Sequence, residues 1–201
     1  TLNDISYCNQ LGYKIKLLGN SLLSKNKNGE DELCCSVEPW LISKNLGLSS
    51  VAGVLNAVQI ESSLAGSVMI TGAGAGGEPT ASAVLADIVD YANETKLFSF
   101  GRNSNEIKNN YNTISYTDKF RYYLRLNVLD KSGVLADVTS IFKDYGLSIE
   151  SFIQKSNQED KTAELVILTH EAEGSVLNVS LSKISALDGV IKKPVCLCIY
   201  S

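Results

Sequence analysis

The chain has 201 residues and a formal net charge of −4 at pH 7. Hydrophobic residues make up 44% and charged residues 20%, which is typical of a globular protein and excludes a wholly disordered or fibrous chain. The small negative charge provides no field favouring nucleic acid, and no apolar run approaches the ~18–20 residues that a membrane span needs. At ~100–200 residues per domain, the length allows one large or two small domains.

The five cysteines and the single histidine form no recognisable metal or nucleophile motif. No C-x-x-C spacing occurs, so we expect no metal site and reduced cysteines, as in a cytoplasmic protein. His170 follows an apolar run and lacks a G-x-S-x-G context, so we expect it to be a structural or solvated residue and not a catalytic one. The chain begins at Thr1 and its only Met is Met69, which suggests a piece of a larger protein.

The first half predicts a mostly antiparallel sheet with one helix before it and one after it. Asn3 or Asp4 is the expected N-cap of the first helix, and Asn28-Gly29 favours a hairpin turn. After Pro39 we expect a polar connection. The predicted elements are a helix over 3–11, strands over 13–17 and 33–37, and a hairpin of strands 51–60 and 65–70.

A Gly-rich turn then runs into the second helix, which begins near Pro79. Glycines allow a ligand to approach the backbone closely, and a helix N-terminus offers free N–H groups to an anionic or polar ligand. Gly72, Gly74 and Gly77 satisfy G-x-G-x-x-G, but a dinucleotide-binding fingerprint should open a parallel βαβ unit. The hairpin-like strands before this turn therefore favour a different ligand-contacting turn, with a purely structural turn as the alternative.

The second half has a clearer pattern after a polar, Asn-rich connection. A strand around 122–128 precedes a turn, and an apolar helical stripe follows that ends at Gly146. The remaining segments read as two strands, a helix and a last strand. The order β-α-β-β-α-β is the ferredoxin-like unit, in which both helices cover one face of a four-stranded sheet. The other face, or an edge, is left for a partner.

Two resemblances follow from these residues. The second half resembles an ACT domain, through its element order and the segment Leu129-Asp-Lys-Ser-Gly-Val-Leu-Ala136. The first half resembles homoserine dehydrogenase. Its matching segments are Asp4 to Gly19, Ser50-Val-Ala-Gly-Val-Leu-Asn-Ala-Val58 and Gly72-Ala-Gly-Ala-Gly-Gly-Glu-Pro-Thr-Ala-Ser-Ala-Val-Leu-Ala-Asp87.

The resemblance implies the C-terminal part of an enzyme that interconverts L-homoserine and L-aspartate 4-semialdehyde with NAD or NADP. In that family the Rossmann domain, the acidic substrate-binding residues and the catalytic lysine precede the segment that matches Asp4 to Gly19. We therefore expect this chain alone to be inactive. The family's Gly-rich turn reaches the cofactor at the position of Gly76, which implies cofactor contacts by Gly74, Ala75, Gly76 and Thr80.

The ACT resemblance implies an amino-acid effector, for which threonine is the expected ligand. The residues that would hold it are Asp130, Gly133, Val134, Leu135 and, from a facing subunit, Gln154. The alternative is that this domain only dimerises.

The predicted fold class is α+β. A partial mixed sheet with helices (1–92) is followed by a linker (93–118), in which Leu97 to Phe100 forms a short docking element, and by an ACT domain (119–201). We also expect a homo-oligomer, a dimer or tetramer. The cysteine usage predicts a cytoplasmic location, and the charge and composition predict neither nucleic acid nor membrane as a partner. Two other functions stay open: a stand-alone amino-acid-sensing module, and a nucleotide-binding domain that uses Gly72, Gly74 and Gly77.

Overall fold

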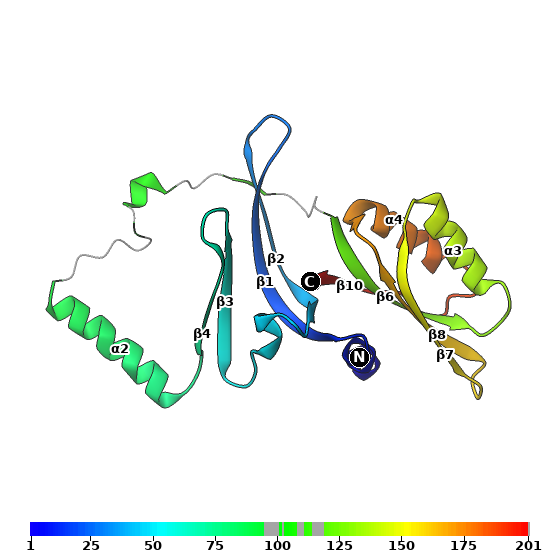
Figure 1. The fold of residues 1–201 in the computed structure, drawn as a ribbon, viewed down its shortest axis with the longest axis horizontal. Coiled ribbons are helices and arrows are strands. Elements are labelled where there is room, and N and C mark those ends of the chain that lie inside the picture. The colour runs from blue at the N-terminus through cyan, green and yellow to red at the C-terminus, as the bar shows by residue number, and fades with distance from the viewer. Residues whose placement is uncertain (95–100, 102, 108–110, 114–118, 201) are drawn as a thin grey trace. The chain divides into compact units, whose positions relative to one another are not determined.

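The computed structural model describes residues 1–94, 101, 103–107, 111–113 and 119–200. The Leu97 to Phe100 element expected in the linker lies outside these residues. The chain divides into two compact units (Figure 1). The first combines residues 1–44 with 113–201, and the second spans 45–112. The expected domain boundaries at 92 and 119 stay a prediction. The two compact units are defined by contacts, and the first of them joins two segments that are far apart in the chain.

One sheet organises the first unit, with its main strands in the order β1-β2-β10-β6-β8-β7. The elements of this unit are α1 (Leu2–Gln10), β1 (Tyr13–Lys25), β2 (Asp31–Ser43), β6 (Lys119–Leu129), α3 (Val134–Asp144), β7 (Ile149–Asn157), β8 (Thr162–Thr169), β9 (Ala172–Glu173), α4 (Gly174–Ser185) and β10 (Val195–Tyr200). From β6 onward the order is β-α-β-β-α-β, apart from the two-residue β9. The predicted α+β class and the ferredoxin-like order are thus confirmed.

Strand β6 lies inside the sheet, between β10 and β8, and its side chains alternate between two cores. On one face, Leu124 and Leu126 are fully buried among residues of α3 and α4, including Val138 and Phe142 of α3. This arrangement confirms the expectation that both helices cover the same face of the sheet.

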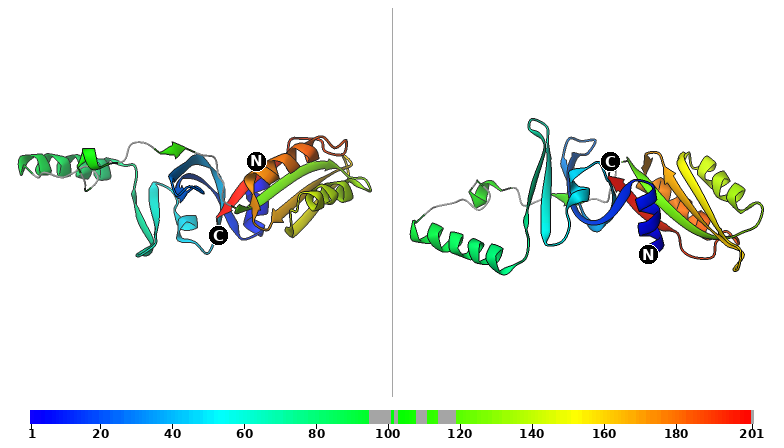
Figure 2. Two further views of the ribbon diagram at one scale, coloured as in Figure 1. Left: turned by 90° about the horizontal axis from the view of Figure 1, so that it is seen from above. Right: turned by 60° about the horizontal axis from the view of Figure 1, so that its bottom comes forward.

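Helix α1 covers the opposite face, which the sequence analysis left open for a partner. Tyr7 and Cys8 of α1 are buried in a second cluster together with Tyr123 of β6 and Val166 of β8. The right-hand view of Figure 2 shows α1 in blue on one side of these strands and α3 in yellow-green on the other. The sheet is therefore sandwiched between two helical layers, one of which comes from the start of the chain.

The β1-β2 hairpin occupies the edge of the sheet beside β10. Strand β2 pairs with β10 in parallel over Trp40 to Ile42, and the Trp40 ring packs edge-on against Phe120 of β6 with centroids 5.2 Å apart. The expected connection after Pro39 is wrong, since β2 continues through this residue to Ser43. The pairing of β2 with β10 begins at Trp40, one residue after Pro39. The N–H that proline lacks is therefore not needed for the hydrogen bonds between these two strands.

The beginning of α1 also differs from the prediction. Thr1 is the N-cap, and Asp4 occupies the third helical position instead of capping the helix itself. The Asp4 backbone N–H donates to Thr1 Oγ1, and the Thr1 backbone nitrogen donates to Asp4 Oδ2 at 2.8 Å. This reciprocal capping box satisfies two donors that the first turn would otherwise leave unpaired.

The second unit contains η1 (Gly47–Ser50), the antiparallel hairpin of β3 (Leu55–Ser62) and β4 (Gly66–Ala73), and α2 (Gly77–Ala92). A short element, η2 (Ser104–Glu106), follows, and β5 (Asn112–Thr113) spans the boundary between the two units. The predicted hairpin and helix are confirmed. None of the α2 residues is buried in this chain, and Leu85 and Ile88 are 61% and 57% exposed. Among the described residues, no helix is long and apolar enough to cross a membrane.

Candidate functional site

The Gly-rich turn connects β4 to α2 in the second unit. All four residues predicted to contact the cofactor lie on this turn or in the first turn of α2, and all are exposed: Gly74, Ala75, Gly76 and Thr80. Gly76 is the residue that precedes the first turn of α2. The structure therefore places the four residues together at one helix N-terminus, as the sequence predicts.

Gly76 has a backbone φ of +130°, a conformation that side chains rarely adopt. Its carbonyl accepts hydrogen bonds from the backbone N–H and the hydroxyl of Thr80, at 3.2 and 2.8 Å. Because no side chain caps the N-terminus of α2, its first backbone N–H groups stay available to an anionic or polar ligand. The turn is thus fixed by Thr80, and the N-terminus of α2 behind it has no side-chain cap.

Gly74 lies against Asn56 of β3. A Cβ atom built at Gly74 would come within 1.6 Å of Asn56 Nδ2, and the Gly74 N–H donates to the Val54 carbonyl at 2.9 Å. By contrast, a Cβ at Gly72 would meet nothing within 4 Å. A side chain at 74 would therefore force the Asn56 side chain to move, whereas a side chain at 76 would strain the backbone itself.

The G-x-G-x-x-G match does not open a Rossmann unit in this structure. The strand before it, β4, pairs antiparallel with β3 in a two-stranded sheet within the described residues. A dinucleotide fingerprint needs a parallel βαβ unit. The fold thus argues against the nucleotide-binding domain kept open in the sequence analysis.

The loop between β6 and α3 forms the second candidate site. A cavity of about 280 Å³ adjoins it, and Val134 is the predicted effector residue that lines this cavity. The other lining residues are Lys131, Ser132, Asp137, Leu187, Asp188 and Gly189. Asp130 and Leu135 lie beside this lining in sequence, and Gly133 turns the chain into α3 with a φ of +98°.

Gln154 lies apart from this loop cavity. It lies on β7, the last strand in the sheet order, where it pairs with Leu165 of β8. It borders a separate cavity of about 250 Å³ that α1 and β7 line. Within one copy of the chain, the structure does not bring Gln154 together with the loop.

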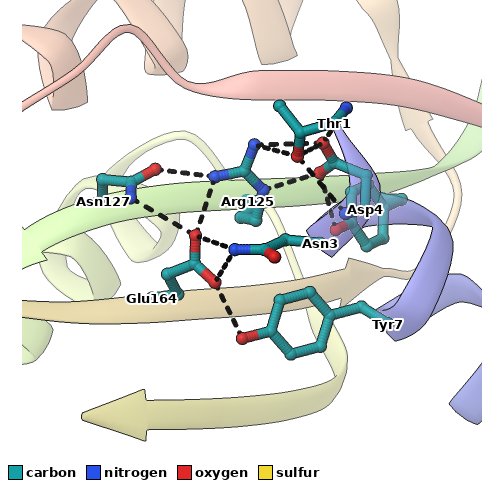
Figure 3. A network of polar contacts seen from close by, with 8 residues as sticks. Thr1, Asn3, Asp4, Tyr7, Arg125, Asn127 and Glu164 are labelled. Carbon is teal, nitrogen blue, oxygen red and sulfur yellow. Dashed lines mark hydrogen bonds and ion pairs between the residues drawn. The ribbon is translucent and has the colours of Figure 1, made fainter. Parts of the chain in front are cut away.

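A third feature, which the sequence analysis did not single out, is a polar cluster between α1 and the sheet (Figure 3). Its centre is Arg125, which is 6% exposed. Arg125 Nε and Nη2 donate to the two carboxylate oxygens of Asp4, at 2.6 and 3.0 Å. Arg125 Nη1 donates to Glu164 of β8 and to Asn127 Oδ1, at 3.1 and 2.7 Å.

The two carboxylates of the polar cluster are surrounded by donors. Besides Arg125, Asp4 accepts from the Thr1 and Tyr123 hydroxyls, at 2.6 and 3.0 Å. Glu164 accepts from the Tyr7 hydroxyl at 2.8 Å, and Figure 3 also shows Asn3 and Asn127 donating to it. Helix α1 is thus attached to β6 and β8 by charge-assisted hydrogen bonds, which are stronger than neutral ones.

These contacts shift the pKa values of the cluster. Burial alone would raise the pKa of Asp4, but the hydrogen bonds from Arg125 and Thr1 hold it well below its usual range. Burial would likewise raise the pKa of Glu164, and the donors Tyr7 and Asn3 together with Arg125 lower it instead. Burial and the neighbouring Glu164 raise the pKa of Tyr7 to about 12. At neutral pH both carboxylates are therefore ionised and paired.

A signal for this cluster was present in the sequence. Arg125 stands in the middle of an apolar strand, at a position that alternates with Leu124 and Leu126 and so points away from the face that α3 and α4 cover. A buried cation requires a paired anion. Its identity could not be predicted, because Asp4 is 121 residues away in the chain.

Comparison with known proteins matches both halves of the chain. Residues 1–89 match the family model described as homoserine dehydrogenase, and residues 122–189 match that of the ACT domain. Residues 1–89 belong to the homoserine dehydrogenase family, and residues 122–189 are an ACT domain. Both resemblances drawn from the sequence are thus confirmed.

Curated relatives agree along nearly the whole chain. Homoserine dehydrogenase of Neisseria gonorrhoeae is 36% identical over 96% of this chain, and that of Pseudomonas aeruginosa is 34% identical over 94%. The chain spans only 44% of the length of each of these relatives. It therefore corresponds to less than half of a homoserine dehydrogenase of that kind.

Solved structures show the same correspondence. The crystal structure of a homoserine dehydrogenase from Thiobacillus denitrificans matches all of this chain, with a TM-score of 0.82 and 33% identity, over 46% of its own length. A homoserine dehydrogenase from S. aureus matches with a TM-score of 0.62 and 25% identity. The order of a homoserine dehydrogenase segment followed by an ACT domain is thus shared with solved enzymes.

Proposed function

We propose that the protein to which this chain belongs interconverts L-homoserine and L-aspartate 4-semialdehyde, with NAD or NADP as cofactor. The observation that carries this proposal is the match of residues 1–89 to the homoserine dehydrogenase family, together with the correspondence of the whole chain to a solved enzyme. The chain contributes the Gly-rich turn to that reaction, and it contributes no residue that we assign as catalytic.

The test is the absorbance of the reduced nicotinamide. We expect homoserine-dependent reduction of NADP or NAD by the full-length protein and none by the 201-residue chain. The physical reason is that the chain supplies only one wall of the cofactor site and no group assigned to proton or hydride transfer. Reduction by the isolated chain would contradict our assignment of the catalytic groups, and a full-length protein without this activity would contradict the proposed function.

The cofactor proposal concerns Gly76 and its neighbours. We propose that the backbone at Gly76, with Gly74, Ala75 and Thr80 around it, contacts the bound cofactor. Two features support this: the exposed turn stands at an uncapped helix N-terminus, and the hydroxyl of Thr80 fixes its geometry. A charged or polar group of the cofactor could accept hydrogen bonds from the first N–H groups of α2.

Gly76→Val in the full-length enzyme is expected to raise the cofactor KM by about tenfold or more, the equivalent of one lost hydrogen bond of about 1.4 kcal/mol. The substitution forces a branched side chain into a backbone with φ +130°, so the turn must change shape. Gly72→Ala is the matched control, because a Cβ there meets nothing within 4 Å. Unchanged kinetics in a folded Gly76→Val enzyme would refute the contact.

The effector proposal concerns the ACT domain. We propose that an amino acid, threonine in the first place, binds at the loop of Asp130 and Gly133 and the helix start at Val134-Leu135. The cavity beside this loop supports the proposal. Since Gln154 lies away from that cavity, we propose that it comes from a facing copy of the chain, which makes the protein a homo-oligomer.

Titration calorimetry of the 201-residue chain with L-threonine tests the effector proposal. We expect binding heat, and light scattering on the same sample is expected to show more than one chain per particle. A second arm uses Gln154→Ala, which should weaken threonine binding without changing the fold. If no heat is seen at any accessible concentration, the ACT domain serves in dimerisation instead.

A further inference from the structure

Strand β6 connects the loop cavity of the ACT domain to the polar cluster under α1. Its last residue, Leu129, leads directly into the loop that begins at Asp130. Four residues earlier, Arg125 makes the ion pair with Asp4 on the opposite face of the sheet. A short stretch of one strand therefore separates a cavity on the α3 side from a helix on the other side.

Backbone hydrogen bonds join the cavity wall to this stretch. The Leu129 N–H donates to the carbonyl of Gly189, which lines the loop cavity, at 2.8 Å. The Ile191 N–H, two residues after Gly189, donates to the carbonyl of Asn127 at 2.8 Å. A shift of the segment around Gly189 must therefore move Asn127 or break one of these bonds.

The side chain of Asn127 continues the connection through the sheet (Figure 3). Its Oδ1 accepts from Arg125 Nη1 at 2.7 Å, and its Nδ2 donates to Glu164 at 3.4 Å. Arg125 in turn holds Asp4 with two of its nitrogens. Asn127 is thus hydrogen-bonded through its backbone to Ile191, near the cavity wall, and through its side chain to Arg125 and Glu164, which bind α1.

Helix α1 can respond to such a movement because it is short. It has nine residues, and isolated helices of fewer than about 12–15 residues are only marginally stable in water. Its order depends on docking through Asp4, Tyr7 and Cys8, which are the buried residues of this helix. A docked and a released α1 would be the two states that coupling between separate places requires.

We propose that Asn127 is a positioning residue that couples the loop cavity to the docking of α1. An amino acid bound at the loop would change the position of Asn127, hence the hold of Arg125 on Asp4, and so the order of the helix that leads into β1. The part of this inference that concerns a ligand rests on the effector proposed above. The mechanical part concerns only this chain and can be tested without a ligand.

The ligand-free test uses hydrogen exchange of the 201-residue chain. A Cβ at Gly189 would come within 2.7 Å of Val134 Cγ2, so Gly189→Ala displaces the cavity wall. We expect exchange of the α1 amides to speed up by about fivefold or more, at the lower end of typical coupling factors. Exchange of the β8 amides, measured in the same sample, corrects for any global loss of stability.

The decisive comparison is the same substitution in an Asn127→Leu background, which removes the side-chain amide but keeps the backbone bond to Ile191. We expect Gly189→Ala to change α1 exchange by less than about twofold there, because non-additivity reports the coupling. Asn157→Leu, at the exposed end of β7, is the matched control and should leave the response intact. An equal response in both backgrounds, or no response of α1 in the original chain, would overturn the proposal.

A further experiment, in which L-threonine is added, distinguishes this inference from the effector proposal. If L-threonine binds by calorimetry, α1 exchange should shift on its addition to the original chain and stay constant in Asn127→Leu, at a similar Kd. Binding without any shift of α1 would overturn the coupling. If threonine gives no heat, the effector proposal fails, and the Gly189→Ala comparison still decides whether Asn127 couples the two places.

Discussion

Replacing Arg125 with Met is expected to lower the free energy of unfolding by about 3–5 kcal/mol, the usual effect of removing one partner from a buried ion pair. Asp4, at 2% exposure, would keep only the amino-terminal group of Thr1 as a cationic partner, and Glu164 would lose one of its donors. Met fills much of the space of the arginine stem, so the loss reflects charge pairing more than packing.

The single tryptophan makes this measurement specific to the first unit. Trp40 is 1% exposed and lies in β2, so its fluorescence in a urea titration reports the unfolding of the sheet that carries Arg125. Arg121→Met is the matched control on the same strand. Arg121 pairs with Glu150 at a more exposed position, and surface pairs contribute only about 0–1 kcal/mol. Equal losses in the two variants would show that the Asp4 pair has no special role.

The pH dependence of this difference follows from the lowered pKa values of Asp4 and Glu164. A carboxyl whose folded pKa lies below its unfolded value stabilises the fold above the unfolded pKa, and this contribution is lost as the pH falls. The stability gap between the original chain and Arg125→Met should therefore be full at neutral pH and narrow as the pH falls below about 4. A gap that stays constant on acidification would contradict the ionic origin of the loss.

Leu41→Ala is expected to destabilise the chain by about 2–5 kcal/mol, as large-to-small changes in a packed core do. Leu41 lies on β2, is fully buried and packs in the cluster under α1 that includes Tyr123 and Val166 of the ACT domain. Because this core is shared, the loss should appear in the ACT strands as well as in the hairpin.

Amide exchange of β8 tests this shared core. We expect the β8 amides to exchange faster in Leu41→Ala, although β8 and Leu41 belong to different family domains. Leu17→Ala on β1 is the matched control, since that leucine is 72% exposed and its removal should leave β8 unchanged. If β8 stayed protected while the hairpin loosened, the ACT domain would be an independent folding unit and the division into two compact units would not describe its stability.

Local patterns predicted most of the elements. The alternation of Tyr122, Leu124 and Leu126, the helical stripe ended by Gly146, and the turn that leads to Pro79 each depend on neighbouring residues. Such short-range signals suffice for element type and order, and they carried both family resemblances. The N-cap at Thr1 was missed because Asn3 and Asp4 are capping residue types too, and the extent of β2 past Pro39 was missed because it depends on pairing with the distant β10.

The sequence by itself determined the β-α-β-β-α-β order and the Gly-rich turn at a helix start, since both follow from spacing along the chain. Only the tertiary structure decided what covers the second face and the edge of the ACT sheet. Asp4 and Arg125 are 121 residues apart, and the parallel pairing of β2 with β10 joins the two halves of the chain. Charge pairing and strand pairing over such separations leave no periodicity in the sequence. The shared sheet and the polar cluster under α1 could therefore be found only in the tertiary structure.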